Sequence, residues 1–232
     1  MTPTAGSCLE PTYFLDHDHP TVRDFTHDVI VSAANPRERA TMLFAAVRDS
    51  IWYDPYSVSR VPEHYRASEV LKVERAYCIP KAVLLTAVLR AAGLPARVGF
   101  ADVRNHLQTD TLRALMGGAD LFVYHGYSSV YLDGRWWKAT PAFNVELCAR
   151  FDVPPIDFDG RSDALMHAFA ADGTRHMEYV RDHGTFDDLP LDRILAALDQ
   201  AYGPIVTAAA GVDDAFSRRQ PGTTRPPKTG RA

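Results

Sequence analysis

The strongest constraint on the fold is a helix-forming segment whose apolar residues do not keep to one side. These apolar residues are Val83, Leu84, Leu85, Val88 and Leu89. At 3.6 residues per turn they cover several faces of a helix, which is typical of a helix buried inside a domain. Pro80 fits the first turn of this helix, and Gly93 followed by Leu94-Pro95 ends it. We therefore predict a central buried helix that begins just after Cys78.

Further helices are predicted on the N-terminal side of this segment, after an irregular lead-in over residues 1–19. The first spans about residues 20–33. A second begins at Asn35-Pro36-Arg37-Glu38, because asparagine caps a helix, proline suits its first position and Glu38 can reach back to its start. Asp54-Pro55 ends that helix, and a short helix is expected over residues 67–73.

After the buried helix the pattern becomes that of strands, over residues 96–101, 121–132 and 135–140. Asp133-Gly134 separates the last two strands. This pair favours a tight hairpin, because both residues of such a turn need a positive φ. The pattern weakens after Pro141, although residues 190–202 again favour a helix.

Length and charge bound the domain organisation and the partners. The 232 residues are 46% hydrophobic and 23% charged, as in ordinary globular proteins. We predict one domain over residues 1–216 and a disordered basic tail over residues 217–232, which is rich in Pro, Gly, Thr and Arg. The tail holds five basic and no acidic residues, so the net charge of -4 becomes about -9 for the rest. A body this acidic repels phosphate, so no nucleic-acid partner is expected.

Three cysteines, Cys8, Cys78 and Cys148, form a poor disulfide framework because they are few and odd in number. Reduced thiols predict a cytoplasmic protein. The first 19 residues have neither a basic start nor an apolar run, so no signal peptide is expected. No apolar stretch approaches eighteen residues, so no membrane span or membrane partner is expected. We interpret Cys8 and Cys148 as structural.

Cys78 lies where a helix begins, and such a position suits a nucleophile. Unpaired N–H groups and the helix dipole favour an anion there, which would lower the pKa of the thiol. The same N–H groups can receive the oxyanion that forms when a carbonyl is attacked. His125, at the start of a predicted strand, can move the proton. Considered alone, each residue is more often a core residue than a catalytic one.

Two runs of sequence carry a family resemblance. Residues 78–97, from Cys78-Ile79-Pro80-Lys81 to Gly93-Leu94-Pro95-Ala96-Arg97, resemble the nucleophile segment of the transglutaminase-like superfamily. Residues 125–141, from His125-Gly126-Tyr127 through Asp133-Gly134-Arg135-Trp136 to Thr140-Pro141, are similar to its histidine hairpin. The likeness covers roughly residues 40–145.

The resemblance implies an α+β fold with a papain-like core, in which N-terminal helices and a buried cysteine-bearing helix pack on an antiparallel sheet. It also implies a Cys-His-Asp triad and cysteine-dependent acyl transfer or hydrolysis. The substrate would be a peptide, amide or thioester, with water or an amine as acceptor. This chemistry requires no cofactor and no metal.

The chain departs from the family pattern at Thr140, where the superfamily usually has aspartate. Threonine brings no charge to the imidazole. Three alternatives follow. Thr140 orients His125 alone; Asn144 reaches the same nitrogen, as an amide does in papain-like triads; or the site has lost catalysis and remains a binding module.

Other polar and aromatic groups are candidates for the walls of a site, with ordinary structural roles as the alternative. One set follows a predicted strand: Asp102, Asn105 and His106. A later set comprises residues 175–179, Asp182 and His183. Aromatic candidates are Trp52, Tyr53 and Tyr56. His17 and His19 could bind a metal, although such a polar run is more often a solvated turn, and the later histidines lack zinc-site spacing.

Overall fold

The structure is a computed structural model that describes residues 8–106, 108–167, 173, 176–203, 214 and 216. Its elements follow one another as α1 (Pro20–Ile30), α2 (Pro36–Ser50), β1 (Trp52–Tyr53), the 3-10 helix η2 (Pro62–Tyr65), α3 (Ala67–Val70), β2 (Arg75–Ala76), α4 (Cys78–Ala91), β3 (Ala96–Asn105), α5 (Asp110–Leu115), β4 (Leu121–Leu132), β5 (Arg135–Ala139), α6 (Val145–Arg150), β6 (Met177–Phe186) and α7 (Leu191–Tyr202). The predicted tail over residues 217–232 lies outside the described residues.

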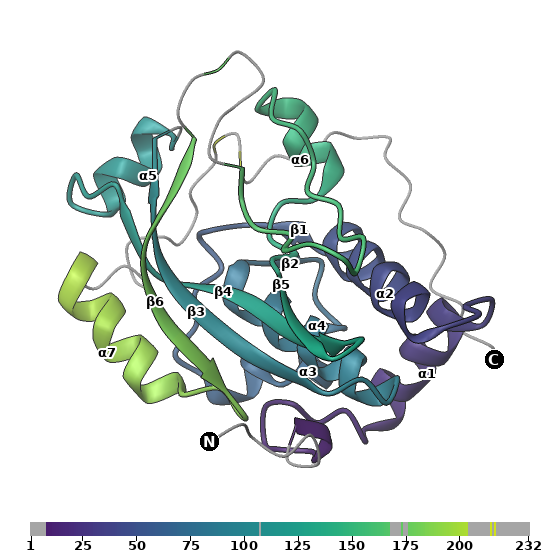
Figure 1. Ribbon diagram of the computed structural model, residues 1–232. Coiled ribbons are helices and arrows are strands. Elements are labelled where there is room, and N and C mark those ends of the chain that lie inside the picture. Colours follow the sequence, from purple (N-terminus) through teal and green to yellow (C-terminus); the bar gives the residue numbers. More distant parts are fainter. Residues whose placement is uncertain are drawn as a thin grey trace.

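The main sheet has four strands in the order β5-β4-β3-β6, and all its neighbours are antiparallel. It curls around the helices behind it, as Figure 1 shows. β1 and β2 form a separate short parallel pair beside the start of α4. The predicted α+β architecture, with a cysteine-bearing helix packed on an antiparallel sheet, is confirmed.

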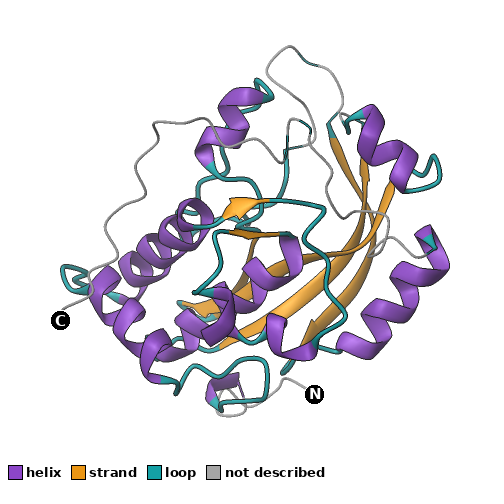
Figure 2. Cartoon of the chain, turned by 180° about the vertical axis from the view of Figure 1, so that it is seen from behind, coloured by secondary structure: helices purple, strands orange, loops and turns teal. Residues whose placement is uncertain are grey.

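The predicted central helix is α4, and every residue from Cys78 to Arg90 is buried. α4 packs on β3 and β4 on one side and on α1, α2 and α3 on the other. Figure 2 shows these helices gathered on the inner side of the sheet. A helix that is apolar on all faces is stable here because each face has a packing partner.

Three local signals in the sequence act as predicted, whereas α2 ends at Ser50, before the predicted stop at Asp54-Pro55. Asn35 caps α2 by accepting a hydrogen bond from the Glu38 N–H at 3.0 Å. Gly93 has φ of 75°, and the N–H of Leu94 donates to the Leu89 carbonyl, which closes the end of α4. Asp133 and Gly134 both have positive φ, of 51° and 83°, in the hairpin between β4 and β5.

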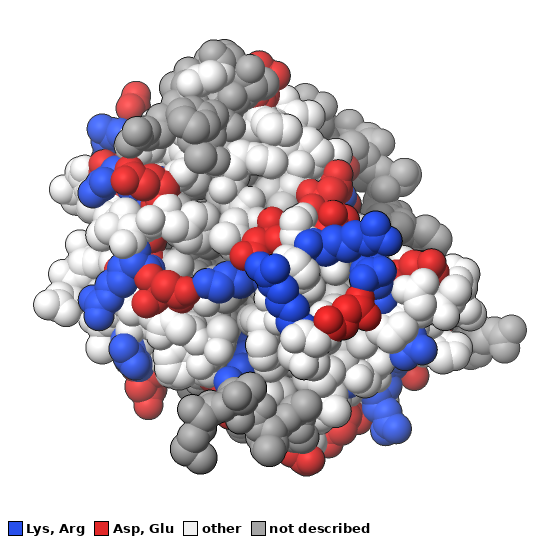
Figure 3. Space-filling model, viewed as in Figure 1, with Lys and Arg blue, Asp and Glu red and all other residues white. Residues whose placement is uncertain are grey.

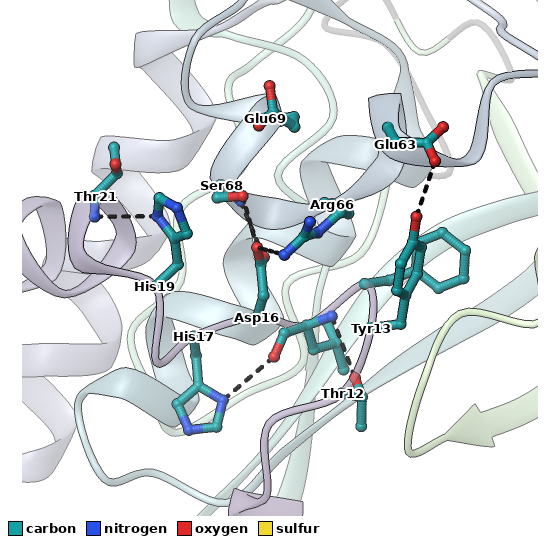
Figure 4. A network of polar contacts seen from close by, with 12 residues as sticks. Thr12, Tyr13, Asp16, His17, His19, Thr21, Glu63, Arg66, Ser68 and Glu69 are labelled. Atoms are coloured by element: carbon teal, nitrogen blue, oxygen red, sulfur yellow. Dashed lines mark hydrogen bonds and ion pairs between the residues drawn. The ribbon is translucent and has the colours of Figure 1, made fainter.

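The lead-in before α1 is anchored by the buried carboxylate of Asp16. This carboxylate accepts hydrogen bonds from the N–H and hydroxyl of Ser68 and pairs with Arg66 (Figure 4). His17 and His19 turn to different partners. His17 contacts the Leu15 carbonyl, while His19 accepts from a backbone N–H and caps α1. Through these contacts the two histidines form part of a turn and of a helix cap. The residues that the structure describes contain no cluster of three or more metal-ligating side chains.

The outer face of the sheet is polar, and its charges are paired. Figure 3 shows basic and acidic side chains interleaved across it. Lys138 pairs with Asp182, and Arg97 with Asp187 at 2.9 Å. Surface ion pairs of this kind contribute little to the free energy of unfolding because water and salt screen them. Apolar surface and buried polar groups meet instead on the inner side of the sheet. No described helix has the length and apolar character needed to cross a membrane.

Candidate active site

Cys78 is the first residue of α4, and its side chain is nearly enclosed, at 8% exposure. The preceding residue, Tyr77, makes no side-chain cap to the helix. The N–H groups of the first turn therefore have no partner from the Tyr77 side chain. Residues Cys78, Ile79 and Gly126 all contribute backbone hydrogen bonding to the thiol.

Gly126 in β4 lets the sheet approach the start of α4. A Cβ atom at this position would lie 3.0 Å from the Cys78 carbonyl oxygen and 3.1 Å from the Ile79 Cα. Both neighbours are backbone atoms that cannot move aside easily, so a side chain here would push strand and helix apart. The glycine therefore brings His125, the residue before it, to the head of α4.

His125 is 4% exposed and lines the same cavity as Cys78. The cavity volume is about 50 Å³. Just before His125 the register between β3 and β4 shifts, and Tyr124 takes a left-handed conformation with φ of 56°. Bulges of this kind bend a strand and redirect its side chains, often beside active sites. The predicted pair is thus brought together by a helix start and a bulged strand.

Thr140, which follows β5, lies against the imidazole. Its Oγ1 is 3.2 Å from His125 Nε2 and donates to the Gly126 carbonyl at 3.2 Å. A hydroxyl has one proton. Because that proton goes to the carbonyl, Oγ1 accepts from Nε2–H, and this tautomer leaves the lone pair of the ring on Nδ1.

Asn144 does not fill the role that the sequence allowed for it. Its side-chain oxygen accepts a hydrogen bond from the Tyr53 backbone N–H at 3.2 Å. This contact ties the start of α6 to β1, two elements that flank the site. Of the two residues proposed to orient the imidazole, the structure brings Thr140 to His125 and Asn144 to Tyr53.

Burial dominates the electrostatics of the pair. It raises the pKa of the Cys78 thiol to about 11, although backbone hydrogen bonds from Gly126 and Ile79 oppose the rise. It also lowers the pKa of His125 to about 4. Both groups are therefore neutral near pH 7, and the expectation of a lowered thiol pKa is wrong for this conformation. The backbone hydrogen bonds at the start of α4 do not outweigh the loss of water around the sulfur.

Asp102 serves the bulge rather than His125. Its carboxylate accepts a hydrogen bond from the Tyr124 N–H at 3.0 Å and contacts His183 Nε2 at 2.7 Å. The His183 ring stacks on Tyr124, with centroids 4.1 Å apart. Two predicted wall residues thus hold the backbone just before His125, in a left-handed conformation that costs a non-glycine residue energy.

The remaining candidates are spread over the molecule. Tyr53 lines the cavity of Cys78, whereas the Trp52 indole donates to the Phe216 carbonyl and the Tyr56 hydroxyl to Asp214.

The polar candidates also have separate surroundings. His106 Nε2 lies 3.7 Å from a carboxylate oxygen of Glu178. Asn105 lines a separate small cavity. Asp182 accepts from the Tyr127 hydroxyl. Residue 175 lies outside the described residues, and Cys8 and Cys148 are buried and do not form disulfides.

Lys81 is an important residue that the sequence pattern did not reveal. It is fully buried one turn after Cys78, and its Nζ donates to the carbonyls of Arg48 and Ile51 at 2.8 and 2.6 Å. Burial lowers its pKa to about 7. The ammonium thereby ties the end of α2 to the first turn of α4. A lysine in a helix usually indicates a solvated face, and its carbonyl partners lie some thirty residues earlier in the chain.

Three solved structures resemble the chain at low identity. A proposed cysteine protease from Cytophaga hutchinsonii has 15% identity and a TM-score of 0.49, and the match covers 81% of this chain and 48% of that one. A proposed protease from Parabacteroides distasonis has 19% identity, a TM-score of 0.37 and coverage of 58% and 24%. The periplasmic domain of TgpA from Pseudomonas aeruginosa has 19% identity, a TM-score of 0.44 and coverage of 60% and 48%.

The chain therefore spans about half of two of these structures and about a quarter of the third. No curated protein matches its sequence. The family model described as the transglutaminase-like superfamily matches residues 23–141, just over half of the chain. That match includes α4 with Cys78, the bulged strand with His125, and Thr140, so the chain belongs to the transglutaminase-like superfamily.

Proposed function

We propose that this protein is a cysteine-dependent acyl-transfer enzyme that forms a thioester on Cys78. The observation that carries the proposal is the arrangement of His125. Its Nε2–H is held by Thr140, and the basic Nδ1 belongs to a ring that lines the same cavity as the thiol. A neutral imidazole with a pKa of about 4 is free to accept a proton throughout the neutral range.

In the first step the Cys78 sulfur attacks the carbonyl carbon of an amide, peptide or thioester. The thiol proton passes to His125 as the sulfur–carbon bond forms, because the thiol is not ionised beforehand. Backbone N–H groups at the start of α4 and at Gly126 receive the oxyanion. Collapse of the tetrahedral intermediate breaks the bond to the leaving group, which takes the proton from His125.

In the second step water or an amine attacks the thioester. His125 takes a proton from this acceptor, and the sulfur leaves and is protonated again. The products are a free acid or a new amide, together with the starting thiol, so no cofactor is consumed. Thr140 keeps the ring in one tautomer through both steps but supplies no charge to the imidazolium, which limits the rate.

A non-catalytic binding module is the second candidate. The pKa values of about 11 for Cys78 and about 4 for His125 favour it, since a neutral pair is less reactive than a thiolate–imidazolium pair. The uncharged Thr140, at the position where the family usually has aspartate, also favours a binding module. A module of this kind would bind its ligand in the cavity without forming a covalent bond.

Intact-mass measurement after incubation with pooled peptides and acyl thioesters separates the two functions. The enzyme predicts an added mass equal to an acyl group, located on Cys78 by peptide mapping. Cys78→Ala should lose the adduct and Cys148→Ala should keep it, because Cys148 lies elsewhere in the core. Non-covalent binding without any adduct would support the binding module.

A further inference from the structure

The cavity beside Cys78 has a size and a lining that restrict which acyl group can reach the sulfur. Its volume is about 50 Å³. An apolar cavity of about 150 Å³ binds a benzene molecule, so a cavity of about a third of that volume accommodates only a few non-hydrogen atoms. Because Cys78 and His125 form part of its wall, a group seated there would be attached to the carbonyl under attack.

Side chains from several elements line the cavity, and they are mainly hydrocarbon. Representative lining residues are Val58, Leu112, Met116, Phe122 and Leu198. They come from the loop after β1, from α5, from the region just after α5, from β4 and from α7. A cavity lined by this many elements is a feature of the folded core rather than a depression on one loop.

Three of the described tyrosines that line the cavity, Tyr77, Tyr124 and Tyr202, turn their hydroxyl groups to protein partners. The Tyr202 hydroxyl donates to the Leu121 carbonyl at 2.7 Å and accepts from the Val123 N–H at 2.6 Å. The Tyr77 hydroxyl lies 2.9 Å from that of Tyr65. The Tyr124 hydroxyl accepts from Arg193 at 2.7 Å. With their polar ends occupied, these residues present aromatic carbon to the cavity.

No Asp, Glu, Lys or Arg side chain lines the cavity among the residues that the structure describes. Its two titratable catalytic candidates, Cys78 and His125, are neutral near pH 7. A charged acyl group would lose its water on entering and find no opposite charge, which is strongly unfavourable. An uncharged hydrocarbon group would instead gain from burial.

We propose that Cys78 accepts a short, uncharged hydrocarbon acyl group, with a few non-hydrogen atoms beyond the carbonyl carbon. This inference rests on the proposed function. In the transfer, the sulfur–carbonyl bond forms while the bond to the leaving group breaks. The thiol proton passes through His125 to that leaving group, so the step needs no oxidant, reductant or further reactant.

A panel of acyl donors tests the proposal on the full-length protein. The 4-methylpentanoyl and succinyl groups form the central comparison, because they match in size and differ in charge. Butyryl and octanoyl probe length. Each group is offered as an N-acetylcysteamine thioester and as a p-nitroanilide, so that preference for a thioester or an amide source is read separately. Acyl-Cys78 is quantified by intact mass over time.

We expect 4-methylpentanoyl and butyryl to acylate Cys78 at least a hundredfold faster than succinyl, and octanoyl about tenfold more slowly than butyryl. Succinyl within threefold of 4-methylpentanoyl would overturn the inference while leaving the acyl-transfer function intact. A complete lack of acyl-Cys78 from every donor would overturn the proposed function itself, and the inference with it.

Val58 supplies a second, independent measurement, because it is half-buried and can carry a longer side chain into the cavity. Val58→Arg should raise the ratio of succinyl to 4-methylpentanoyl acylation at least tenfold, since it adds the missing opposite charge. Val58→Gln controls for length, and Val180→Arg, on the exposed part of β6, controls for net charge. An equal rise in the ratio for all three variants would contradict the assignment of this cavity to the acyl group.

Discussion

His125 Nε2 lies 3.2 Å from Thr140 Oγ1, and the same hydroxyl donates to the Gly126 carbonyl. The contact fixes the orientation and tautomer of the imidazole without adding charge. In a triad the acidic member does both, and stabilises the imidazolium as it forms. Thr140 therefore supplies the orientation of the imidazole without the stabilising negative charge, whereas an aspartate supplies both.

Replacing Thr140 by aspartate tests the missing charge. A carboxylate beside the ring raises the pKa of His125 and favours the thiolate–imidazolium pair. We expect Thr140→Asp to raise the rate of iodoacetamide alkylation of Cys78 at pH 7 at least tenfold, measured by peptide mass. Thr140→Val, which matches threonine in size, should lower acyl transfer about tenfold because Nε2 loses its acceptor. Equal alkylation rates in the unaltered protein, Thr140→Asp and Thr140→Val would contradict the role of residue 140 in setting the charge and orientation of His125.

The pH dependence of acyl transfer reports the neutral pair directly. His125 must be unprotonated to act as a base, and its pKa is about 4. The rate should therefore rise as pH increases through about 4 and then stay level, because the thiol ionises only near its pKa of about 11. Initial rates from pH 3.5 to 9.5, with tryptophan fluorescence to verify folding, provide the test. A decrease between pH 7 and 9 would instead indicate loss of an imidazolium proton.

The contact of Asp102 with the Tyr124 N–H positions the bulge before His125. Asp102→Ala leaves that buried N–H and His183 without a partner, which should cost about 1–3 kcal/mol of unfolding free energy. It should also lower acylation of Cys78 about tenfold, since His125 is no longer held in place. Asp182→Ala is the matched control, because it removes a carboxylate of β6 that pairs with Lys138 on the open face. The assignment is wrong if both variants acylate equally fast.

Two buried histidines should make the protein acid-sensitive. Burial lowers the pKa of both His125 and His176 to about 4, whereas the unfolded chain has values near 6.5. Between these limits the unfolded state binds more protons, so the unfolding free energy falls as pH falls. Stability is complete above about pH 6.5 and decreases towards pH 4, by roughly 3 kcal/mol for each histidine.

Urea unfolding at pH 7 and pH 5 measures this loss. His176→Phe removes one of the two histidines. It should reduce the difference in unfolding free energy between pH 7 and pH 5 by about half. His176 is the better choice for substitution because it lines a cavity separate from that of Cys78. Identical midpoints for the unaltered protein at both pH values would show that these histidines titrate normally.

Local chemistry explains what could be predicted from the sequence. Asn35 acts through its side-chain oxygen on a backbone N–H three residues later, and Asp133-Gly134 act through their positive φ, so each signal needs only its immediate neighbours in the chain. The apolar run of α4 can only be accommodated in a core. The pairing of Cys78 with His125 in one cavity could be predicted only from the family resemblance, because local capping, turn and hydrophobicity signals do not relate two distant residues.

Features that depend on distant partners could not be predicted. β6, an edge strand, was missed because it carries Arg181, Asp182 and His183 and reads as a polar loop. Lys81 gains its role only from the carbonyls at the end of α2. The raised pKa of Cys78 likewise comes from burial by the whole fold. A cytoplasmic location stays a prediction from cysteines that are few and odd in number.

The central claim is that His125 serves as the base for Cys78, and a single-turnover acylation rate tests it most directly. His125→Asn keeps a donor for Thr140 but has no basic nitrogen. At pH 7, with a butyryl thioester as donor, the account predicts a rate at least a hundredfold below that of the unaltered protein, partly restored by added imidazole. A His125→Asn rate within threefold of the unaltered protein, with Cys78 still the acylated residue, would contradict the account.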